Sequence, residues 1–293
     1  MQNSSQRFIK KLVRCLPRFR GLGRCILAAD SLFGAKSDGA SSLLLATVNG
    51  DCRLVVDGRV LEQKFAFYYG EWESELILAA IQQYHRGAFY DVGGSIGLYA
   101  VALGRHCRAA KGFVRTFEPF PANLERLRDN LKLNQLTDRE VKVHATALNN
   151  APGVLRVALV ADGLPGNAKV VQQGGVEVPV RTLDEIWIEN DREDVGFIKI
   201  DTEGFDGQVL LGATLLLQQC RPNMLVEFNR ERMTNLGFSF AEIWRWLTEE
   251  LEYLAYEVKP RGSLVPVKNP GELENMLFIH KQKVPQNQNV DAV

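Results

Sequence analysis

Residues 89–97, which read FYDVGGSIG, decide the fold. A short apolar run ends in an acid, glycines follow, and a helical pattern begins at Ile96. Glycine leaves room for a ligand close to the backbone. The amino end of a helix offers unpaired N–H groups and a positive dipole end, which suit a carboxylate. The stretch therefore predicts a strand, a turn and a helix that together bind the anionic end of a ligand.

Strand and helix patterns alternate outward from this stretch. We expect strands at 88–92, 113–117, 141–147, 197–200, 224–228 and 275–280, with helices at 73–85, 96–105, 121–134, 183–189, 207–219 and 240–253. Such alternation predicts βαβ units and a parallel sheet. Two or three short strands, around 43–48, 53–56 and 64–68, are expected before the alternation begins. An antiparallel hairpin of 154–160 with 176–180 is expected to interrupt it.

The next predicted strand ends in Glu118, 27 residues after Asp91. The two oxygens of a carboxylate at this place can accept both ribose hydroxyls of a bound nucleoside. A dinucleotide site would require glycines two and five residues after Gly93, but Ser95 and Leu98 stand there. The spacing favours the nucleoside S-adenosylmethionine, whose methionine carboxylate would lie at the glycine turn.

A third predicted strand also ends in acids, within the sequence FIKIDTEG at 197–204. Ligands of open α/β sheets bind outside the carboxyl ends of the strands, so Asp201 is expected near the reacting methyl, where it can orient or deprotonate a hydroxyl. Glu203 is either a second polar contact or a cap for the next helix. Asp201, Glu227 and Asn229 are the candidate oxygen ligands for Mg²⁺, although strand-end carboxylates are common without metal.

Charge and cysteine content limit the classes of protein. The 293 residues carry 35 basic and 35 acidic side chains, but seven basic residues precede the first acid, Asp30, which leaves about −7 on the remainder. A nucleic-acid-binding domain would normally show a basic excess, so we expect no nucleic-acid partner. The five cysteines form no Cys-x-x-Cys pair, which is typical of a reducing, cytoplasmic setting.

The basic segment 7–20 has an apolar stripe at helical spacing, with cations on the other face. A basic amphipathic helix can lie on an anionic membrane surface. The alternative is a helix packed on the domain, or a frayed end. No run approaches the roughly 18 apolar residues of a transmembrane helix. We therefore expect a cytoplasmic protein. The alternative is a protein that also contacts the membrane surface through residues 7–20.

Taken together, these motifs resemble the FkbM family of methyltransferases, whose first motif reads Asp-Val-Gly-Ala-Asn-x-Gly. The segments that carry the resemblance are DVGGSIG (91–97), FEPFPANL (117–124), NLKLN (130–134), VPVRTLD (178–184), FIKIDTEG (197–204), VLLGA (209–213) and RP (221–222). The resemblance spans roughly 72–280. This chain departs from the family at Gly94 and Ser95, at Thr202, and at Asn149-Asn150, which is the departure on the adenine side.

The resemblance implies a Rossmann-like class I methyltransferase fold, with a seven-stranded, mostly parallel sheet, helices on both faces and one antiparallel strand. It implies an S-adenosylmethionine-dependent O-methyltransferase, often acting on sugar hydroxyls in glycans or natural products. The expected catalytic residues are Asp201 and Glu203. The expected cofactor-binding residues are Asp91, Gly93, Gly94, Ser95, Gly97, Glu118, Pro119, Ala147, Leu148 and Asp201.

The chain is expected to divide into a basic segment (1–34), a β/helix extension (35–86), the methyltransferase domain (87–283) and a disordered tail (284–293). Two other functions remain open. One is a nucleotide-binding oxidoreductase, and the other is a catalytically silent module that binds S-adenosylmethionine. Binding of NAD would favour the first, and a lack of cofactor affinity would favour a silent module.

Overall fold

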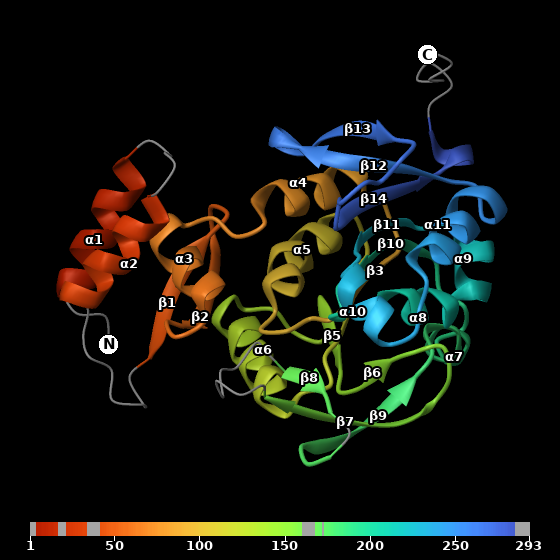
Figure 1. The fold of residues 1–293 in the computed structure, drawn as a ribbon, viewed down its shortest axis with the longest axis horizontal. Coiled ribbons are helices and arrows are strands. Elements are labelled where there is room, and N and C mark those ends of the chain that lie inside the picture. The colour runs from red at the N-terminus through yellow and green to blue at the C-terminus, as the bar shows by residue number, and fades with distance from the viewer. Residues whose placement is uncertain (1–3, 17–21, 34–41, 160–167, 172, 285–293) are drawn as a thin grey trace.

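The computed structural model describes residues 4–16, 22–33, 42–159, 168–171 and 173–284, and its centre is an eight-stranded sheet (Figure 1). The strand order is β13-β12-β14-β11-β10-β3-β4-β5. The bounds are β3 Ala88–Val92, β4 Phe113–Phe117, β5 Val141–His144, β10 Val195–Ile200, β11 Asn223–Glu227, β12 Tyr253–Lys259, β13 Ser263–Val267 and β14 Asn275–His280.

Five neighbouring strands of this sheet, from β11 to β5, run parallel. The chain starts at β3, builds outward through β4 and β5, and then returns to place β10 and β11 on the other side of β3. The direction of building reverses between β3 and β10, and in open α/β sheets such a point is where ligands bind. The predicted class I fold is confirmed, and β14 is the predicted antiparallel strand beside β11.

Helices cover both faces of the sheet, as predicted. One face packs against the first group of helices, α4 Ser74–Gln83, α5 Leu98–Ala109 and α6 Pro121–Leu133. The other face packs against α7 Leu183–Glu189, α8 Asp206–Leu211, α9 Thr214–Cys220 and α11 Phe240–Arg245. Successive residues of β3 point to opposite faces: Phe89 joins the first core and Tyr90 the second. Such two-sided burial explains why the strands are apolar throughout.

The sheet has one strand more than the expected seven. β13 lies between residues 253 and 275, where we expected no helix or strand, and it pairs with β12, antiparallel, at the edge of the sheet. Pro266 is tolerated there because an edge strand does not need every N–H group. The predicted helix 240–253 is also too long. It ends in a π-helix, η2 Trp246–Glu250, because buried Tyr253 pairs with His280 and begins β12.

Two further expectations about elements were wrong. Residues 64–68, expected as a strand, belong to helix α3 Leu61–Tyr69, whose buried Gln63, Ala66 and Phe67 follow helical spacing. The single helix expected at 207–219 is two helices. Asp184 accepts hydrogen bonds from the backbone N–H groups of Leu215 and Leu216, at 3.0 and 2.9 Å, and so starts α9 as a separate helix.

The amino-terminal part lies at one end of the molecule (Figure 1). Its elements are α1 Ser4–Cys15, α2 Leu22–Phe33, β1 Leu43–Val48, β2 Cys52–Asp57 and α3. Within the described ranges, no helix combines the length and the apolar character needed to cross a bilayer. Residues 17–20 of the predicted basic segment, and the predicted tail beyond Val284, lie outside the described residues.

Two buried asparagines, Asn130 of α6 and Asn134 directly after this helix, hold the β1–β2 hairpin on the domain. Asn130 accepts from the N–H of Val55 at 2.7 Å, and its amide donates to the carbonyl of Ile96 at 2.8 Å. Asn134 bonds both backbone groups of Arg53. These two asparagines of the NLKLN segment therefore form hydrogen bonds with backbone groups along the edge of β2. Without them, those groups would be unpaired.

A second sheet, of order β6-β9-β7-β8, contains the predicted hairpin. Its strands are β6 Ala147–Leu148, β7 Gly153–Leu159, β8 Ala168–Val170 and β9 Val176–Arg181. β7 and β9 pair antiparallel as expected, while β8 adds to the far side of β7; Val160 lies outside the described residues. Val157 and Val178 pack on Phe120, so the hairpin lies beside the end of β4.

The helices that complete the described chain are α10 Arg230–Asn235, η3 Pro260–Gly262 and η4 Lys281–Lys283.

Candidate functional site

The turn after β3 lies directly against the end of β10. Gly93 has φ 80°, and a Cβ atom placed on it would lie 1.8 Å from the carbonyl oxygen of Asp201. Only glycine satisfies both the left-handed backbone and this close approach. The N–H of Asp201 in turn donates to the carbonyl of Val92 at 3.1 Å. The structure therefore brings together the predicted glycine turn and the predicted catalytic acid.

The same turn also contacts the end of β4. The N–H groups of Gly93 and Gly94 both donate to the carbonyl of Phe117 at 3.0 Å. Ser95, which has a left-handed φ of 47°, donates its N–H to Oε2 of Glu118 at 2.8 Å. Asparagine, the residue of the family motif at this position, adopts this backbone region more readily than serine. The turn and the predicted ribose acid are thus hydrogen-bonded neighbours.

The carboxylate of Glu118 is buried and accepts three N–H groups. The donors are Ser95 to Oε2, and the Phe120 backbone and the Asn123 amide to Oε1, at 2.8, 2.8 and 3.3 Å. Burial raises the pKa of Glu118 to about 7, although these donors oppose the shift. A carboxylate has about four acceptor sites. Glu118 therefore keeps room for a ligand hydroxyl without losing an existing bond.

Helix α5 opens from the turn with a free amino end. Gly97, which precedes it with φ 93°, has no side chain to cap it, and the carboxylate of Asp91 faces the N–H of Ala100 in the first turn. Asp91 lies below, fully buried, and its Oδ2 accepts from the hydroxyl of Thr116 at 2.9 Å. Its Oδ1 has no hydrogen-bond partner among the described side chains and backbone groups. An uncapped helix end and an orphaned carboxylate oxygen suit the carboxylate and the ammonium of an amino acid, respectively.

Lys199 connects the turn to the acids, and sequence reasoning did not select it. It pairs with Asp91 across two parallel strands, and its ammonium lies 3.2 Å from both the Gly93 carbonyl and Oδ2 of Asp201. The same ammonium stands 5.0 Å from the ring centroid of Tyr99. The hydroxyl of Tyr99 donates to Glu73 at 2.8 Å. We call the side chains of Lys199, Asp91, Asp201, Tyr99, Glu73 and Glu227 the Lys199 cluster.

The charges of the Lys199 cluster are unequal, with one cation among four carboxyl groups. Burial alone lowers the pKa of Lys199, but the charges of Asp201, Asp91 and Glu73 outweigh it and hold the pKa above its usual range. Glu227 ends β11 beside Asp201, because Val226 pairs with Ile200. Burial, and then the charge of Asp201, raise the pKa of Glu227 to about 8. Acids of this kind are characteristic of functional clefts.

Glu203 has a different environment from Asp201. It is half exposed, has a left-handed φ of 57°, and forms an ion pair with Arg232 of α10. Asp206, and not Glu203, makes the bonds at the start of α8: it accepts from the N–H and the hydroxyl of Thr202 at 2.7 and 2.8 Å. The predicted contact of Glu203 with a substrate stays a prediction.

The candidate magnesium ligands are only partly available. The side chain of Asn229 caps α10 by accepting from the N–H of Arg232 at 3.1 Å. Among the residues that the structure describes, no three His, Cys, Asp or Glu side chains are grouped as a ligand set. Asp201 and Glu227 remain side by side, and a role for Mg²⁺ between them stays a prediction.

The predicted adenine-side residues lie near the end of β4. Two of them belong to the second sheet, and Pro119 follows β4 directly. Ala147 and Leu148 form β6, which runs parallel to β9. Leu148 is buried in the core, whereas Ala147 and Pro119 are half-buried. Ala147 packs on Phe120, the second residue after Glu118. These positions are compatible with a base lying beside the predicted ribose acid.

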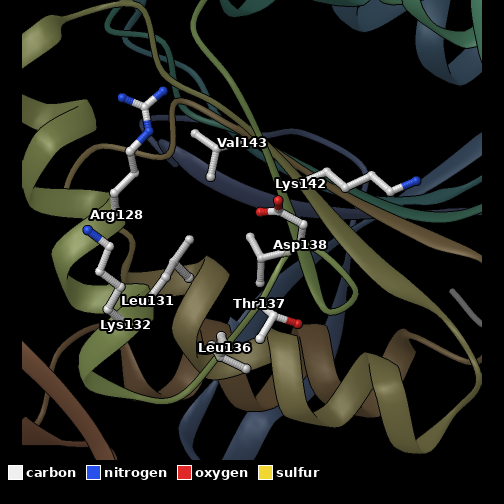
Figure 2. Close-up of a pocket in the computed structure, with 9 residues that line it drawn as sticks. Arg128, Leu131, Lys132, Leu136, Thr137, Asp138, Lys142 and Val143 are labelled. Atoms are coloured by element: carbon white, nitrogen blue, oxygen red, sulfur yellow. The ribbon is translucent and has the colours of Figure 1, made fainter.

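A surface pocket of about 590 Å³ lies elsewhere, at the β5 edge of the sheet (Figure 2). Arg128 and Lys132 of α6 line it, with apolar Leu131 and Val143. The ammonium of Lys142 is directed away from it, over the ring of Phe113 at 4.5 Å. None of the predicted site residues lines this pocket, which is separate from the candidate site at the ends of β3, β4 and β10.

Three features together define the class I methyltransferase fold. They are a doubly wound sheet with an antiparallel β14, a glycine turn after β3, and an acid directly after β4. Residues 91–257 match the family described as the methyltransferase FkbM domain. The chain therefore belongs to the FkbM methyltransferase family, as the motifs indicated. No curated protein matches the chain.

Several solved structures are similar in part. A methyltransferase FkbM from Methylobacillus flagellatus is 20% identical with a TM-score of 0.44, and the match covers 67% of this chain but only 44% of that one. An O-methyltransferase from Bacillus cereus in complex with SAH is 13% identical, with a TM-score of 0.40 and coverages of 70% and 78%. A precorrin-6y C5,15-methyltransferase from Geobacter metallireducens is 12% identical, with a TM-score of 0.38 and coverages of 70% and 84%.

Proposed function

We propose that this protein transfers the methyl group of S-adenosylmethionine to a hydroxyl oxygen at the carboxyl edge of the sheet. The observation that supports the proposal most is the 2.8 Å bond from the N–H of Ser95 to Oε2 of Glu118. It joins a glycine turn, which suits the amino-acid end of the cofactor, to an acid that suits its ribose. Membership of the FkbM family supplies methyl transfer as the reaction.

The cofactor would lie across the ends of β3 and β4. Its carboxylate would meet the uncapped amino end of α5, and its ammonium would meet Oδ1 of Asp91. Glu118 would accept a ribose hydroxyl. Gly93, Gly94 and Gly97 would bring the backbone close to the ligand, and Pro119, Ala147 and Leu148 would flank the adenine.

The acceptor hydroxyl would meet Asp201, which is partly exposed and held by Lys199. The bound cofactor supplies an electrophilic methyl group on a sulfonium. Asp201 would orient the hydroxyl and take its proton on a carboxylate oxygen. The product is a methyl ether, and the proton rests on the carboxyl of Asp201. Glu203 is retained as a second polar contact.

A polyhydroxyl acceptor, such as a sugar of a glycan or of a natural product, suits the Lys199 cluster. Carboxylates only accept hydrogen bonds when ionised, and neighbouring sugar hydroxyls donate them. Asp201 and Glu227 end adjacent strands, so Asp201 can accept from one hydroxyl of a ring. Glu227, whose pKa is raised to about 8, can donate to or accept from the neighbouring hydroxyl. The half-exposed sides of these acids leave space for such a contact.

Calorimetry with S-adenosylhomocysteine and with NAD⁺ tests the cofactor. We expect S-adenosylhomocysteine to bind, and Glu118→Ala to weaken that binding by about tenfold to a hundredfold, as loss of a hydrogen bond to a charged group implies. Glu189→Ala, at an exposed acid of α7, is the control. Binding of NAD⁺ instead would indicate an oxidoreductase. Binding of neither would contradict the proposed cofactor site, and binding of S-adenosylhomocysteine without methyl transfer to any acceptor would indicate a silent module.

Transfer itself is tested with S-adenosylmethionine labelled in the methyl group and a panel of sugars and oligosaccharides. Alkali separates the products, because it cleaves a methyl ester and leaves a methyl ether intact. We expect an alkali-stable product, and we expect Asp201→Asn to lower turnover about a hundredfold or more with cofactor affinity near wild type. An equal loss of both quantities would contradict the role given to Asp201.

A further inference from the structure

Helix α1 has two apolar stripes, and only one of them packs on the protein. Ile9 and Val13 are buried, with 7% and 4% of their surface exposed. Phe8 and Leu12 on the adjacent side, and Leu16 directly after the last residue of α1, are spaced by four residues and are 69%, 50% and 39% exposed. Residues four apart share one side of a helix. These three residues, the α1 stripe, form a continuous apolar surface open to solvent.

The α1 stripe is not needed to dock the helix. The ammonium of Lys10 lies 4.3 Å from the ring centroid of Phe67 in α3, and burial, followed by the charge of Arg14, lowers the pKa of Lys10 to about 8. Arg14 donates to the carbonyl of Tyr68 at the end of α3, and to that of Thr47 at 2.9 Å. Ile9, Val13 and these two cations therefore hold α1 in place, and they leave the α1 stripe outward.

Cations flank the α1 stripe. Arg7 and Lys11 are exposed one residue before Phe8 and one before Leu12. Residues 1–29 contain no acid at all, whereas the chain from Asp30 onward carries about −7. Arg24 of the adjacent helix α2 is exposed as well. Positive charge is thus concentrated on the helices that carry exposed apolar side chains.

We propose that α1 docks this protein on the surface of an anionic lipid bilayer, with the α1 stripe in the acyl boundary and Arg7 and Lys11 at the headgroups. An amphipathic helix binds such a surface through buried apolar area together with attraction to anionic lipids. A soluble phosphate offers no apolar layer for Phe8. A second copy would bring the same cations opposite Arg7 and Lys11, and like charges repel at such an interface.

Sedimentation of the full chain with lipid vesicles tests the proposal. We expect binding to phosphatidylcholine vesicles that contain phosphatidylglycerol, and binding about tenfold or more weaker to phosphatidylcholine alone. High salt should weaken the first interaction, because surface charges are screened. Failure of the wild-type chain to bind the anionic vesicles overturns the proposal.

Phe8→Ser with Leu12→Ser is the decisive variant, since Ile9 and Val13 stay in place to hold the helix. We expect it to lower vesicle affinity by about tenfold or more, with an unchanged melting temperature and unchanged affinity for S-adenosylhomocysteine. The matched control is Leu236→Ser with Leu254→Ser, two leucines that are 40% and 45% exposed elsewhere. An equal loss in the control, or a dimer in sedimentation analysis that the Phe8 variant abolishes, overturns the proposal.

Discussion

The ammonium of Lys199 lies 3.2 Å from Oδ2 of Asp201. The same nitrogen lies 3.2 Å from the carbonyl of Gly93, so one buried cation touches both the acceptor-side acid and the glycine turn. A buried charge is stable only when it is paired. Lys199 therefore positions Asp201 relative to the turn and offsets the negative charge of the acids around it.

Lys199→Met removes this cation without removing the aliphatic stem. Burial raises the pKa of Asp91, and the surroundings of Glu73 raise its pKa although much of that residue is exposed; the charge of Lys199 opposes both shifts. Without it, both pKa values rise further, so the pH at which activity is half-maximal should move upward. We expect turnover to fall about a hundredfold, measured as methyl transfer across a pH series.

Lys199→Arg retains the charge, so its pH profile should stay near wild type even where turnover falls. Lys132→Met, at an exposed lysine of α6, is the control and should change neither quantity. A Lys199→Met profile that overlays the wild-type profile would show that the cation does not act on the acids.

Cofactor affinity should depend on the ionisation of Glu118. Burial raises its pKa to about 7, and only the ionised carboxylate accepts through both oxygens. Affinity for S-adenosylhomocysteine should therefore rise with pH up to about 7, by at most about tenfold per pH unit, and then level off. Calorimetry over that range measures it.

Glu118→Gln should flatten this dependence, whereas Glu227→Gln should retain it. The stability of the ligand-free protein should change in the opposite direction. A pKa raised by folding means that the folded state binds a proton more tightly, so the contribution of Glu118 to stability is lost as pH rises through about 7. Affinity that is independent of pH in the wild type would remove Glu118 from the ribose site.

Most of the sheet could be predicted because its strands are buried on both faces. The apolar runs around Phe89, Val114 and Ile198 allow no other placement, and glycines or acids end each of them. The errors occur where distant contacts decide. Phe67 is apolar in either a strand or a helix, and only packing on β1 and β2 selects α3. β12 begins at Tyr253 because of its partner His280, which stands 27 residues later.

The site was predicted in part for a related reason. Asp91, Glu118 and Asp201 end neighbouring parallel strands, and strand ends meet at one edge of a sheet. Lys199 could have been found, because a lysine in the middle of the apolar run FIKI must be buried and paired. Tyr99 and Glu73 had no such signal: they reach the site from helix α5 and from the turn before α4, whose positions depend on tertiary packing.

Gly94→Ala should damage the site although the family motif has alanine there. A Cβ atom at Gly94 would lie 2.1 Å from Oγ1 of Thr116. Thr116 would have to rotate and lose its 2.9 Å bond to Asp91. We expect the free energy of unfolding to fall by about 1–3 kcal/mol, measured by denaturant titration, with weaker binding of S-adenosylhomocysteine.

Two companion variants make the Gly94 experiment decisive. Gly153→Ala is the control, because a Cβ there meets nothing within 4 Å. Gly94→Ala with Thr116→Ala removes the colliding oxygen, so the two losses should be less than additive. Strict additivity would show that the collision with Thr116 is not the cause.

Asn130→Ala tests whether the amino-terminal hairpin supports the cofactor turn. The side chain is fully buried and bonds the N–H of Val55 and the carbonyl of Ile96. Its loss leaves two buried backbone groups unpaired, at about 1–3 kcal/mol each. We expect stability to fall by about 3 kcal/mol and the amide of Val55 to exchange faster with deuterium. Binding of S-adenosylhomocysteine should weaken as well, because Ile96 belongs to the turn.

Asn235→Ala, at an exposed asparagine of α10, is the control. If Val55 stays as protected as in the wild type, Asn130 does not hold the hairpin.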